Sequence, residues 1–407
     1  MNKIRRSVYR LYLTTTTSTG SLFAGHLPSC SSFRSRQISS SCKMSSREQT
    51  QKATRSEGEV IFEEIKGKGV ITLNRPKALN ALNLSMIESI FPVLKEWESA
   101  NKQFVIIKAE GGKAFCAGGD IKSVTDSAKE GSNLYKEFFK REYFLNNLIG
   151  TLTVPYIALI DGITMGGGVG LSVHGPYRVA TERTMFAMPE TAIGLFPDVG
   201  GSYFLPRLGG KLGLYLALTG YRLKGGDTFK AGVATHMCQS NMLPMLEQDL
   251  ISLDSHKPQD IEQVLKKYHD QCPDIKKPFS LDPHMVDINK FFNAGSVEEI
   301  ISNLNKSGSE WGKKTAENLG KMSPTSLKIS LKLLEVGATL DLQECLQIEY
   351  RLTQRCCEDH DFIEGVRALL VDKDQNPKWK PNTLEGVTNA TVDKYFSELP
   401  SDRELAL

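Results

Sequence analysis

The run GITMGGGVG at residues 162–170 decides the fold of this chain, because it places a glycine-rich loop directly after the short apolar segment at residues 156–160. A segment of that length and composition is typical of a buried strand. A second glycine-rich run, AFCAGGDI at residues 114–121, follows a similar segment at residues 104–109. Each loop therefore lies at the C-terminal end of a predicted strand and before a predicted helix, where α/β proteins bind ligands.

The two loops have a chemical interpretation and a purely structural one. Glycine lets the backbone approach a ligand closely, and helix N-termini present unpaired N–H groups to negative charge. One N–H from each loop could hold the oxyanion that develops at a carbonyl under attack. Tight turns and close packing would explain either loop alone, whereas two such loops in this order favour the chemical interpretation.

The segments before these loops predict a hairpin and a helix. Short β-branched runs at Val60–Ile65 and residues 70–74 flank the turn sequence KGKG and predict paired strands. A helix is expected to begin near Ser85, where Ser85 and Glu88 match a capping box. Its apolar stripe at helical spacing comprises Ile87, Ile90, Phe91, Leu94 and Trp97.

The rest of the chain alternates predicted strands with predicted helices before becoming mainly helical. A helix is expected over residues 132–149, and short strands are expected over residues 177–180 and 184–187. From about residue 200 onward the pattern is mostly helical. Alternation of this kind predicts an α/β fold with layers of helix and parallel sheet.

We expect four parts along the chain. They are a transit peptide with linker at 1–52, a core that holds the site at 53–240, a C-terminal helical region at 241–380, and a tail at 381–407. Residues 1–50 contain eight basic residues and one acidic residue, so they carry a charge of +7. A basic leader rich in Ser and Thr is typical of organelle import and predicts a mitochondrial protein.

The composition also excludes several classes of protein. The whole chain carries a net charge of +3, so residues 51–407 carry −4 once residues 1–50 are removed. An acidic body offers no general attraction to nucleic acid, and we expect no direct nucleic-acid partner. No apolar stretch reaches the length of a membrane-spanning helix, so we expect no membrane partner. The cysteines lack metal-ligand spacing, which predicts reduced thiols and no metal.

Several motifs resemble the crotonase (enoyl-CoA hydratase/isomerase) superfamily. The glycine-rich loops carry part of the resemblance, together with LNRP at residues 73–76, NAL at residues 80–82 and Pro189-Glu190. Longer motifs are similar to the 3-hydroxyisobutyryl-CoA hydrolase family within it, and the resemblance spans about residues 58–380. These longer motifs are MGGGVGLS at residues 165–172, MPETAIGLFPDVG at residues 188–200 and DFIEGVRA at residues 361–368.

The resemblance implies a crotonase fold, which is a spiral of ββα turns with a C-terminal helical region. It also implies that the backbone N–H groups of Gly119 and Gly167 form an oxyanion hole. Catalytic roles carry over to Glu190 and Asp198, and substrate binding to Glu142, Gly167, Glu190 and Asp198. No cofactor is implied, since coenzyme A is part of the acyl-CoA substrate.

The three acids each have an alternative interpretation. Glu190 could be an exposed loop acid, and Asp198 could cap the helix that follows it. Glu142 lies on an apolar helical stripe with Phe138, Leu145 and Ile149, where a carboxylate is costly unless it is paired or functional. Its alternative is a buried ion pair with Lys140 or Arg141, and the favoured role is contact with a substrate hydroxyl.

Other residues near the loops have weaker claims to a function. Cys116 lies in a glycine-rich loop, but no histidine is near it in sequence, so a catalytic thiol is not expected. His174 is assigned a packing role. Arg75 and Lys77 lie in a loop that resembles the coenzyme A-contacting loop of the family, although a solvated surface loop explains them equally well.

The resemblance implies hydrolysis of the thioester of 3-hydroxyisobutyryl-CoA, or a related short 3-hydroxyacyl-CoA, in valine breakdown. Hydratases of this superfamily carry a second catalytic glutamate where this chain has Gly170, and its absence argues against hydration. Another crotonase activity and a structural role in a mitochondrial assembly such as the ribosome are the alternatives. A homo-oligomer and an association with such an assembly both remain open.

Overall fold

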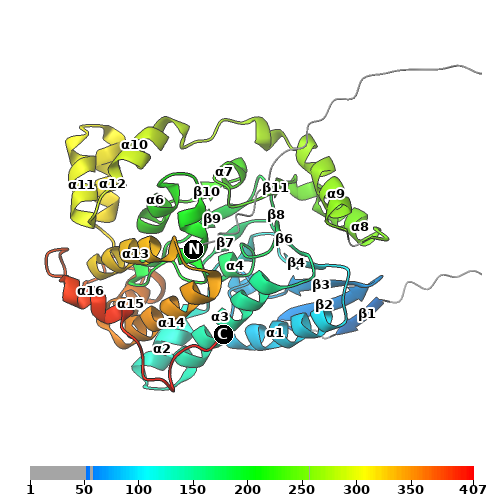
Figure 1. The fold of residues 1–407 in the computed structure, drawn as a ribbon, viewed down its shortest axis with the longest axis horizontal. Helices are drawn as coiled ribbons and strands as arrows, with labels where there is room; N and C mark the ends of the chain where they lie inside the picture. Colours follow the sequence, from blue (N-terminus) through cyan, green and yellow to red (C-terminus); the bar gives the residue numbers. More distant parts are fainter. Residues whose placement is uncertain (1–51, 56–57, 256) are drawn as a thin grey trace, which may run out of the picture. The chain divides into compact units, whose positions relative to one another are not determined.

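The computed structural model describes residues 52–55, 58–255 and 257–407, and these belong to one compact unit (Figure 1). The predicted leader lies outside the described residues except for Lys52, which begins strand β1 (Lys52–Arg55). The predicted division at residues 240 and 380 remains a prediction. Among the described residues, no helix combines the length and apolar character that crossing a membrane requires.

The larger sheet has seven strands in the order β1-β2-β3-β4-β6-β8-β11. Its first three strands pair antiparallel, and the predicted hairpin is confirmed by β2 and β3, which pair from Val60 opposite Leu73. From β3 to β11 all pairs are parallel. The remaining bounds are β2 Val60–Ile65, β3 Lys68–Leu73, β4 Val105–Ala109, β6 Tyr156–Ile160, β8 Tyr177–Ala180 and β11 His236–Met237.

The smaller sheet has four short strands in the order β10-β9-β7-β5. The pairs β5–β7 and β7–β9 are parallel, whereas β9–β10 is antiparallel. Successive passes of the chain place one strand in each sheet before a helical segment, which is the predicted spiral of ββα turns. The strands are β5 Ala114–Cys116, β7 Ile163–Met165, β9 Met185–Ala187 and β10 Leu223–Lys224.

Helices of the first half pack against these sheets. Helix α1 (Leu84–Ser99) packs on α3 (Leu134–Thr151). The capping box predicted at Ser85 is wrong, because the side chain of Asn83 caps α1 by accepting a hydrogen bond from the Met86 amide. The other helices of this part are α2 Ile121–Lys129, α4 Gly167–Gly170, α5 Gly201–Phe204, α6 Leu212–Thr219 and α7 Gly226–Lys230.

The later part of the chain is helical, as predicted. Helices α8 (Leu243–Ile251) and α9 (Pro258–Gln271) cover one face of the larger sheet and form a second hydrophobic core with it. The C-terminal helices pack against the first half on the other side (Figure 1). They are α10 Met285–Phe291, α11 Val297–Lys306, α12 Glu310–Leu319, α13 Pro324–Gly337, α14 Leu342–Glu358, α15 His360–Val366 and α16 Asn389–Phe396.

Short 3₁₀ turns and one π-helical turn lie between the strands and α-helices. One of the 3₁₀ turns, η2 (Glu190–Ile193), begins at a predicted catalytic residue. A π-helical turn, η7 (Arg367–Val371), continues from α15. The other 3₁₀ turns are η1 Pro76–Ala78, η3 Leu205–Arg207, η4 Ser240–Met242, η5 Pro273–Lys276 and η6 Asp282–His284.

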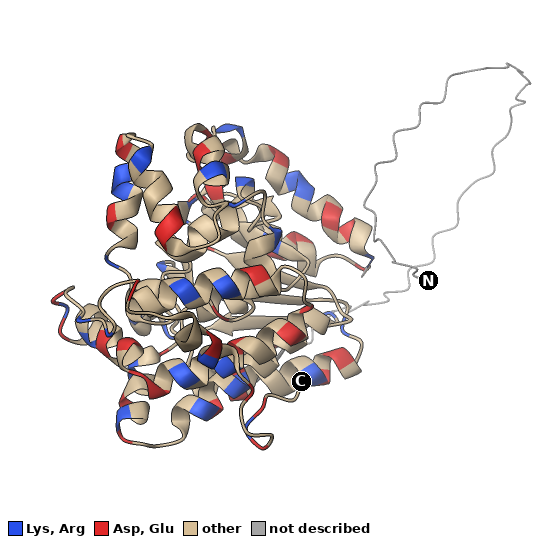
Figure 2. Ribbon diagram, turned by 60° about the vertical axis from the view of Figure 1, so that its left-hand side comes forward, with Lys and Arg blue, Asp and Glu red and all other residues tan. Residues whose placement is uncertain are grey.

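Acidic and basic residues are interspersed along the helices of the described part of the chain (Figure 2). Ion pairs join many of them, such as Lys108 with Glu247 and Arg351 with Glu404. The absence of a nucleic-acid partner remains a prediction.

Replacement of Trp97 tests the packing of α1 on the larger sheet. Trp97 is fully buried, and a Cβ placed on Gly69 of β3 would lie only 2.3 Å from its indole. We expect Trp97→Ala to lower the free energy of unfolding by about 3–5 kcal/mol in urea denaturation, because a large cavity remains. Val286→Ala is the control, since Val286 is 78% exposed and should change stability by less than about 0.5 kcal/mol. Equal effects of the two substitutions would contradict this packing.

Candidate active site

Three of the predicted site residues each follow the end of one of three neighbouring parallel strands. Strands β5, β7 and β9 lie side by side in the smaller sheet. Gly119 follows the end of β5, Gly167 follows the end of β7, and Glu190 follows the end of β9. Since the C-terminal ends of parallel strands meet at one edge, residues distant in sequence are brought together there.

The two glycines place their amide groups next to each other. A Cβ on Gly167 would lie 3.4 Å from the amide nitrogen of Gly119. Leu82 fixes the Gly119 loop, because its N–H donates to Gly118 and its carbonyl accepts from Asp120. Within the described residues, neither the Gly119 nor the Gly167 N–H donates to another backbone group across these loops. Two adjacent unpaired N–H groups are the geometry that an oxyanion requires.

Glu142 lies against this pair of amides. It projects from α3, its side chain is 2% exposed, and its Oε1 would lie 2.6 Å from a Cβ on Gly167. The expected alternative of an ion pair is wrong, because Arg141 instead pairs with Glu137. Among the described residues, Oε1 of Glu142 has no hydrogen-bond partner. A buried acceptor without a partner is costly unless a ligand supplies one.

Glu190 lies on the other side of the β7 loop. Its side chain is 5% exposed, so the alternative of an exposed loop acid is wrong. Its Oε1 would lie 3.2 Å from a Cβ on Gly166, and its Oε2 has no hydrogen-bond partner in the described part of the chain. Glu142 and Glu190 therefore flank the loop that carries Gly167, and each leaves one oxygen unsatisfied.

Asp198 completes a set of three buried carboxyl groups. Its Oδ2 accepts a hydrogen bond from the hydroxyl of Tyr143 at 2.9 Å. The alternative role as a helix cap is wrong, because Gly200 is the N-cap residue of α5 and no side chain caps that helix. The turn after Asp198 is held by Glu349, which accepts hydrogen bonds from the Gly200 amide at 2.8 Å and the Ser202 amide at 3.0 Å.

Burial changes the acid strength of all three groups. It raises the pKa of Glu142 and of Glu190 well above the ordinary value, and the charge of Asp198 raises both further. Burial also raises the pKa of Asp198 to about 7, although the hydrogen bond from Tyr143 opposes this shift. A carboxyl group with a pKa of about 7, such as that of Asp198, can exchange protons efficiently at physiological pH.

One cavity of about 130 Å³ brings all five predicted site residues together. Residues from the C-terminal helical region also reach it, since Leu370 of η7 lines the cavity while remaining 44% exposed. The remaining lining residues are Ala117, Gly118, Ile121, Phe138, Phe139, Met165, Gly166, Pro189, Ile193 and Leu195. The set is mostly apolar with a few convergent polar groups, as binding sites generally are.

Residues near the site that carry no predicted role are explained by packing. Burial raises the pKa of the Cys116 thiol to about 12, which disfavours a thiolate nucleophile. Burial lowers the pKa of His174 to about 4, and its ring lies 2.7 Å from the carbonyl of Val199. Arg75 forms ion pairs with Glu59 and Asp120. Contact of the loop that carries Arg75 and Lys77 with coenzyme A remains a prediction.

Three supporting residues are absent from the sequence predictions. Asn146 lies four residues after Glu142 on the same face of α3, and helical spacing could have identified it. A Cβ on Gly170 would lie 2.7 Å from Asn146 Nδ2 and 2.8 Å from Val199 Cβ. Tyr143 and Glu349 contact the Asp198 turn across 55 and 149 residues, and no local pattern indicates such contacts.

The two-sheet spiral with this site at the ends of β5, β7 and β9 defines an enzyme of the crotonase fold. Comparison with known families agrees, since the pattern of the Enoyl-CoA hydratase/isomerase family matches residues 68–396. The chain belongs to this family.

The curated relatives carry one name. The chain is 58% identical to "3-hydroxyisobutyryl-CoA hydrolase, mitochondrial" of Danio rerio, over 87% of this chain and 93% of that protein. It is 55% identical to the Homo sapiens protein of the same name, over 86% of this chain and 91% of that protein.

Solved structures of more distant relatives share the fold. A carnitinyl-CoA dehydratase from Mycobacterium thermoresistibile superposes with a TM-score of 0.78 and 36% identity, covering 86% of this chain and 98% of that one. An enoyl-CoA hydratase from Rhodobacter sphaeroides superposes with a TM-score of 0.76 and 34% identity, covering 86% of this chain and all of that one.

The raised pKa of Glu142 predicts how stability depends on pH. Its folded-state pKa exceeds the ordinary value of 4.5, so above that pH the folded state holds more protons than the unfolded state. The free energy of unfolding must then fall as pH rises, from about pH 4.5 up to the raised pKa. We expect Glu142→Gln to make this decline shallower in urea denaturation between about pH 5 and pH 8.

The matched control for this prediction is Glu137→Gln on the same helix. Glu137 is 49% exposed and pairs with Arg141, so its replacement should leave the slope of stability against pH unchanged. Parallel curves for the wild type and Glu142→Gln would show that Glu142 titrates as a solvated carboxyl group.

Proposed function

We propose that this site hydrolyses the thioester of 3-hydroxyisobutyryl-CoA, or a related short 3-hydroxyacyl-CoA, to the free acid and coenzyme A. The observation that carries the proposal is the pair of unpaired amides at Gly119 and Gly167, flanked by buried carboxyl groups with unsatisfied oxygens. The protein is an acyl-CoA thioester hydrolase of the 3-hydroxyisobutyryl-CoA type, like the relatives that are 55–58% identical over most of its length.

The oxyanion hole performs the first part of the reaction. In the proposed complex, the thioester carbonyl oxygen accepts hydrogen bonds from the N–H groups of Gly119 and Gly167. Negative charge grows on that oxygen as the carbonyl carbon becomes tetrahedral. Donors that are already fixed in position stabilise this charge without reorganisation, and one such donor is typically worth about 10²–10³ in rate.

Glu190 performs the bond-forming step in one of two ways. As a general base it removes a proton from water, and the water oxygen bonds to the carbonyl carbon. As a nucleophile its carboxylate attacks that carbon and forms an anhydride, which water then cleaves. In both routes the carbon–sulfur bond breaks, and the coenzyme A sulfur leaves with the electron pair and receives a proton.

Asp198 and Glu142 handle protons and the substrate. Asp198, with its pKa of about 7, is suited to deliver a proton to the leaving sulfur or to hold the substrate. The unsatisfied Oε1 of Glu142 is an acceptor for the 3-hydroxyl group of the acyl chain. A site built to bond a hydroxyl group discriminates strongly against acyl chains that lack it.

The environment of Gly170 supports hydrolysis over hydration. The resemblance implies that hydratases carry a glutamate at this position. Here a side chain on residue 170 would collide with Asn146 and Val199, so that carboxylate has no room. The alternative of a structural component of a mitochondrial assembly is not favoured, because the curated relatives discussed above are named as hydrolases.

The same relatives and the family give the cellular location of the enzyme and the class of its substrate. The protein is mitochondrial, as the names of its relatives at 55–58% identity state. Its substrate is an acyl-CoA, in keeping with its family. Function without a metal or redox cofactor remains a proposal, and so do self-association and contact with a mitochondrial assembly.

Replacement of Glu190 tests the proposed chemistry. We expect Glu190→Gln to slow release of free coenzyme A from 3-hydroxyisobutyryl-CoA by about 10²–10⁴-fold, because an amide neither removes a proton nor attacks the carbonyl. Thiol release is followed with a chromogenic reagent, and crotonyl-CoA serves as the test for hydration. Glu317→Gln, an exposed replacement on α12, is the matched control and should retain full activity.

Near-normal activity of a folded Glu190→Gln enzyme would remove Glu190 from the mechanism. Hydration of crotonyl-CoA by the wild type would instead show that the site catalyses hydration, as the hydratases of the family do. The absence of coenzyme A release from well-folded wild type would point to a different acyl group.

A further inference from the structure

The residue that follows Asp198 has a left-handed backbone conformation that is costly for its side chain. Val199 has a φ of 51°, and it is the β-branched member of the non-glycine residues with positive φ in the described part of the chain. Gly200 continues the turn with a φ of 82°. A valine in this region is strained, and such a conformation persists only where the surrounding contacts enforce it. The position of Asp198 therefore depends on what holds residues 199–202.

Glu349 of α14 holds this turn from a distant part of the sequence. Its side chain is fully buried. Oε2 accepts a hydrogen bond from the Gly200 amide at 2.8 Å, and Oε1 accepts from both the amide and the hydroxyl of Ser202. The Gly201 amide between them donates to the carbonyl of Asp198 at 2.7 Å. Both carboxyl oxygens are therefore committed to the backbone that follows Asp198.

The space around the turn leaves little room for another arrangement. Nε2 of His174 donates to the carbonyl of Val199 at 2.7 Å, since a carbonyl only accepts. A Cβ on Gly200 would lie 2.4 Å from Cε1 of the same ring and 3.1 Å from Cδ1 of Leu342. Leu342 and Glu349 both belong to α14, so this helix meets the turn with an apolar contact as well as with the carboxyl group.

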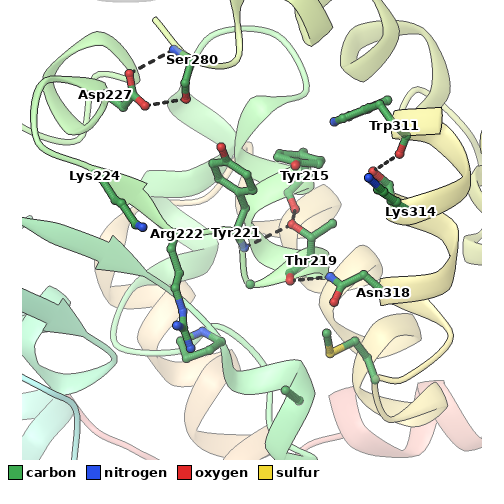
Figure 3. Close-up of a pocket in the computed structure, with 15 residues that line it drawn as sticks. Tyr215, Thr219, Tyr221, Arg222, Lys224, Asp227, Ser280, Trp311, Lys314 and Asn318 are labelled. Carbon is green, nitrogen blue, oxygen red and sulfur yellow. Dashed lines mark hydrogen bonds between the residues drawn. The ribbon is translucent and has the colours of Figure 1, made fainter. Parts of the chain in front are cut away.

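Glu349 lines neither of the two cavities that adjoin the turn carrying Glu190. One is the active-site cavity. The other is a larger cavity of about 810 Å³ beside α12, where the rings of Tyr215, Tyr221 and Trp311 lie close together (Figure 3). A group outside both cavities does not touch a substrate bound in either of them. Glu349 can therefore act on the reaction through the residues that it holds.

The other end of the turn reaches the active site. Asp198 lines the active-site cavity together with Glu190, and its Oδ2 accepts from the hydroxyl of Tyr143 at 2.9 Å. Relaxation of Val199 to an allowed conformation would rotate the chain next to Asp198 and shift its carboxyl group. A displacement of about 1 Å within an active site can cost about 10²-fold in rate.

We propose that Glu349 is a positioning residue, which keeps Val199 in its left-handed conformation and thereby keeps the Asp198 carboxyl group in the active-site cavity. The simpler alternative is that Glu349 only satisfies two buried amides and stabilises the fold. The inference rests on the proposed function, because it gives Asp198 a part in the reaction. One of the two measurements below is therefore independent of turnover.

Hydrogen exchange followed by mass spectrometry tests the hold on the turn. We expect Glu349→Met, which is similar in length and removes both acceptor oxygens, to make the Gly200 and Ser202 amides exchange at least about tenfold faster. Glu349→Gln keeps one acceptor oxygen and should give a smaller increase. Exchange in α9, which packs in the second core, should stay unchanged. The matched control is Glu335→Met, a replacement of an exposed glutamate on α13, and it should leave exchange at the turn unchanged.

A double-mutant cycle tests whether Glu349 acts through Asp198. We expect Glu349→Met to lower kcat/KM for release of coenzyme A from 3-hydroxyisobutyryl-CoA by about 10–10²-fold, because Asp198 is displaced. In an Asp198→Asn background the same substitution should lower it by less than about threefold, since residues that act as a unit are not additive. A merely structural role would produce the same fold-change in both backgrounds. Glu349→Gln should retain more activity than Glu349→Met, and Glu335→Met should retain all of it.

Three results would overturn the proposal. One is unchanged exchange at Gly200 and Ser202 in a Glu349→Met protein whose circular dichroism is that of the folded enzyme. Another is an equal loss of activity in the two backgrounds, and the third is full activity of Asp198→Asn. If the wild type releases no coenzyme A, the proposed function fails, whereas the exchange rates still decide whether Glu349 holds the turn.

Discussion

The structure depends on one constraint, which is the burial of three carboxyl groups around two unpaired backbone amides. Glu142, Glu190 and Asp198 are between 2% and 5% exposed and have no cation beside them in the described part of the chain. Burial of unpaired acids costs free energy that the rest of the fold must offset. Active sites commonly lower the stability of a protein in this way, because the same buried groups are needed for the reaction.

The C-terminal helices are the part of the fold that holds this arrangement. Glu349 of α14 accepts hydrogen bonds from the backbone amides that follow Asp198. The Ser323 amide at the start of α13 donates to the carbonyl of Thr191, in the turn that carries Glu190. Gly194 ends that turn at φ 75°, and a Cβ there would lie 2.2 Å from the carbonyl of Asp361. The strands place the site residues, and these helices fix their orientation.

The sequence predicted the parts of this account that have a local pattern. Glycine-rich loops after apolar segments indicated the strand ends, and the stripe around Glu142 indicated a buried acid, because both patterns repeat over a few residues. The strands β5 and β7 were missed, because each lies inside one of the glycine-rich runs, and glycine indicates a loop. The Asn83 cap was missed because Ser85 matched the capping pattern equally well. Glu349 and Tyr143 act across long separations that only the folded chain brings together.

The central claim is that Glu190 is a buried carboxyl group whose pKa lies well above its ordinary value of 4.5. Infrared difference spectroscopy of wild type against Glu190→Gln over a pH series measures its ionisation directly. The account predicts a protonated carboxyl band that persists well above pH 4.5 and disappears only at higher pH, because burial disfavours the charged form. A carboxylate band that develops fully near the ordinary pKa would show that Glu190 is solvated and would contradict the account.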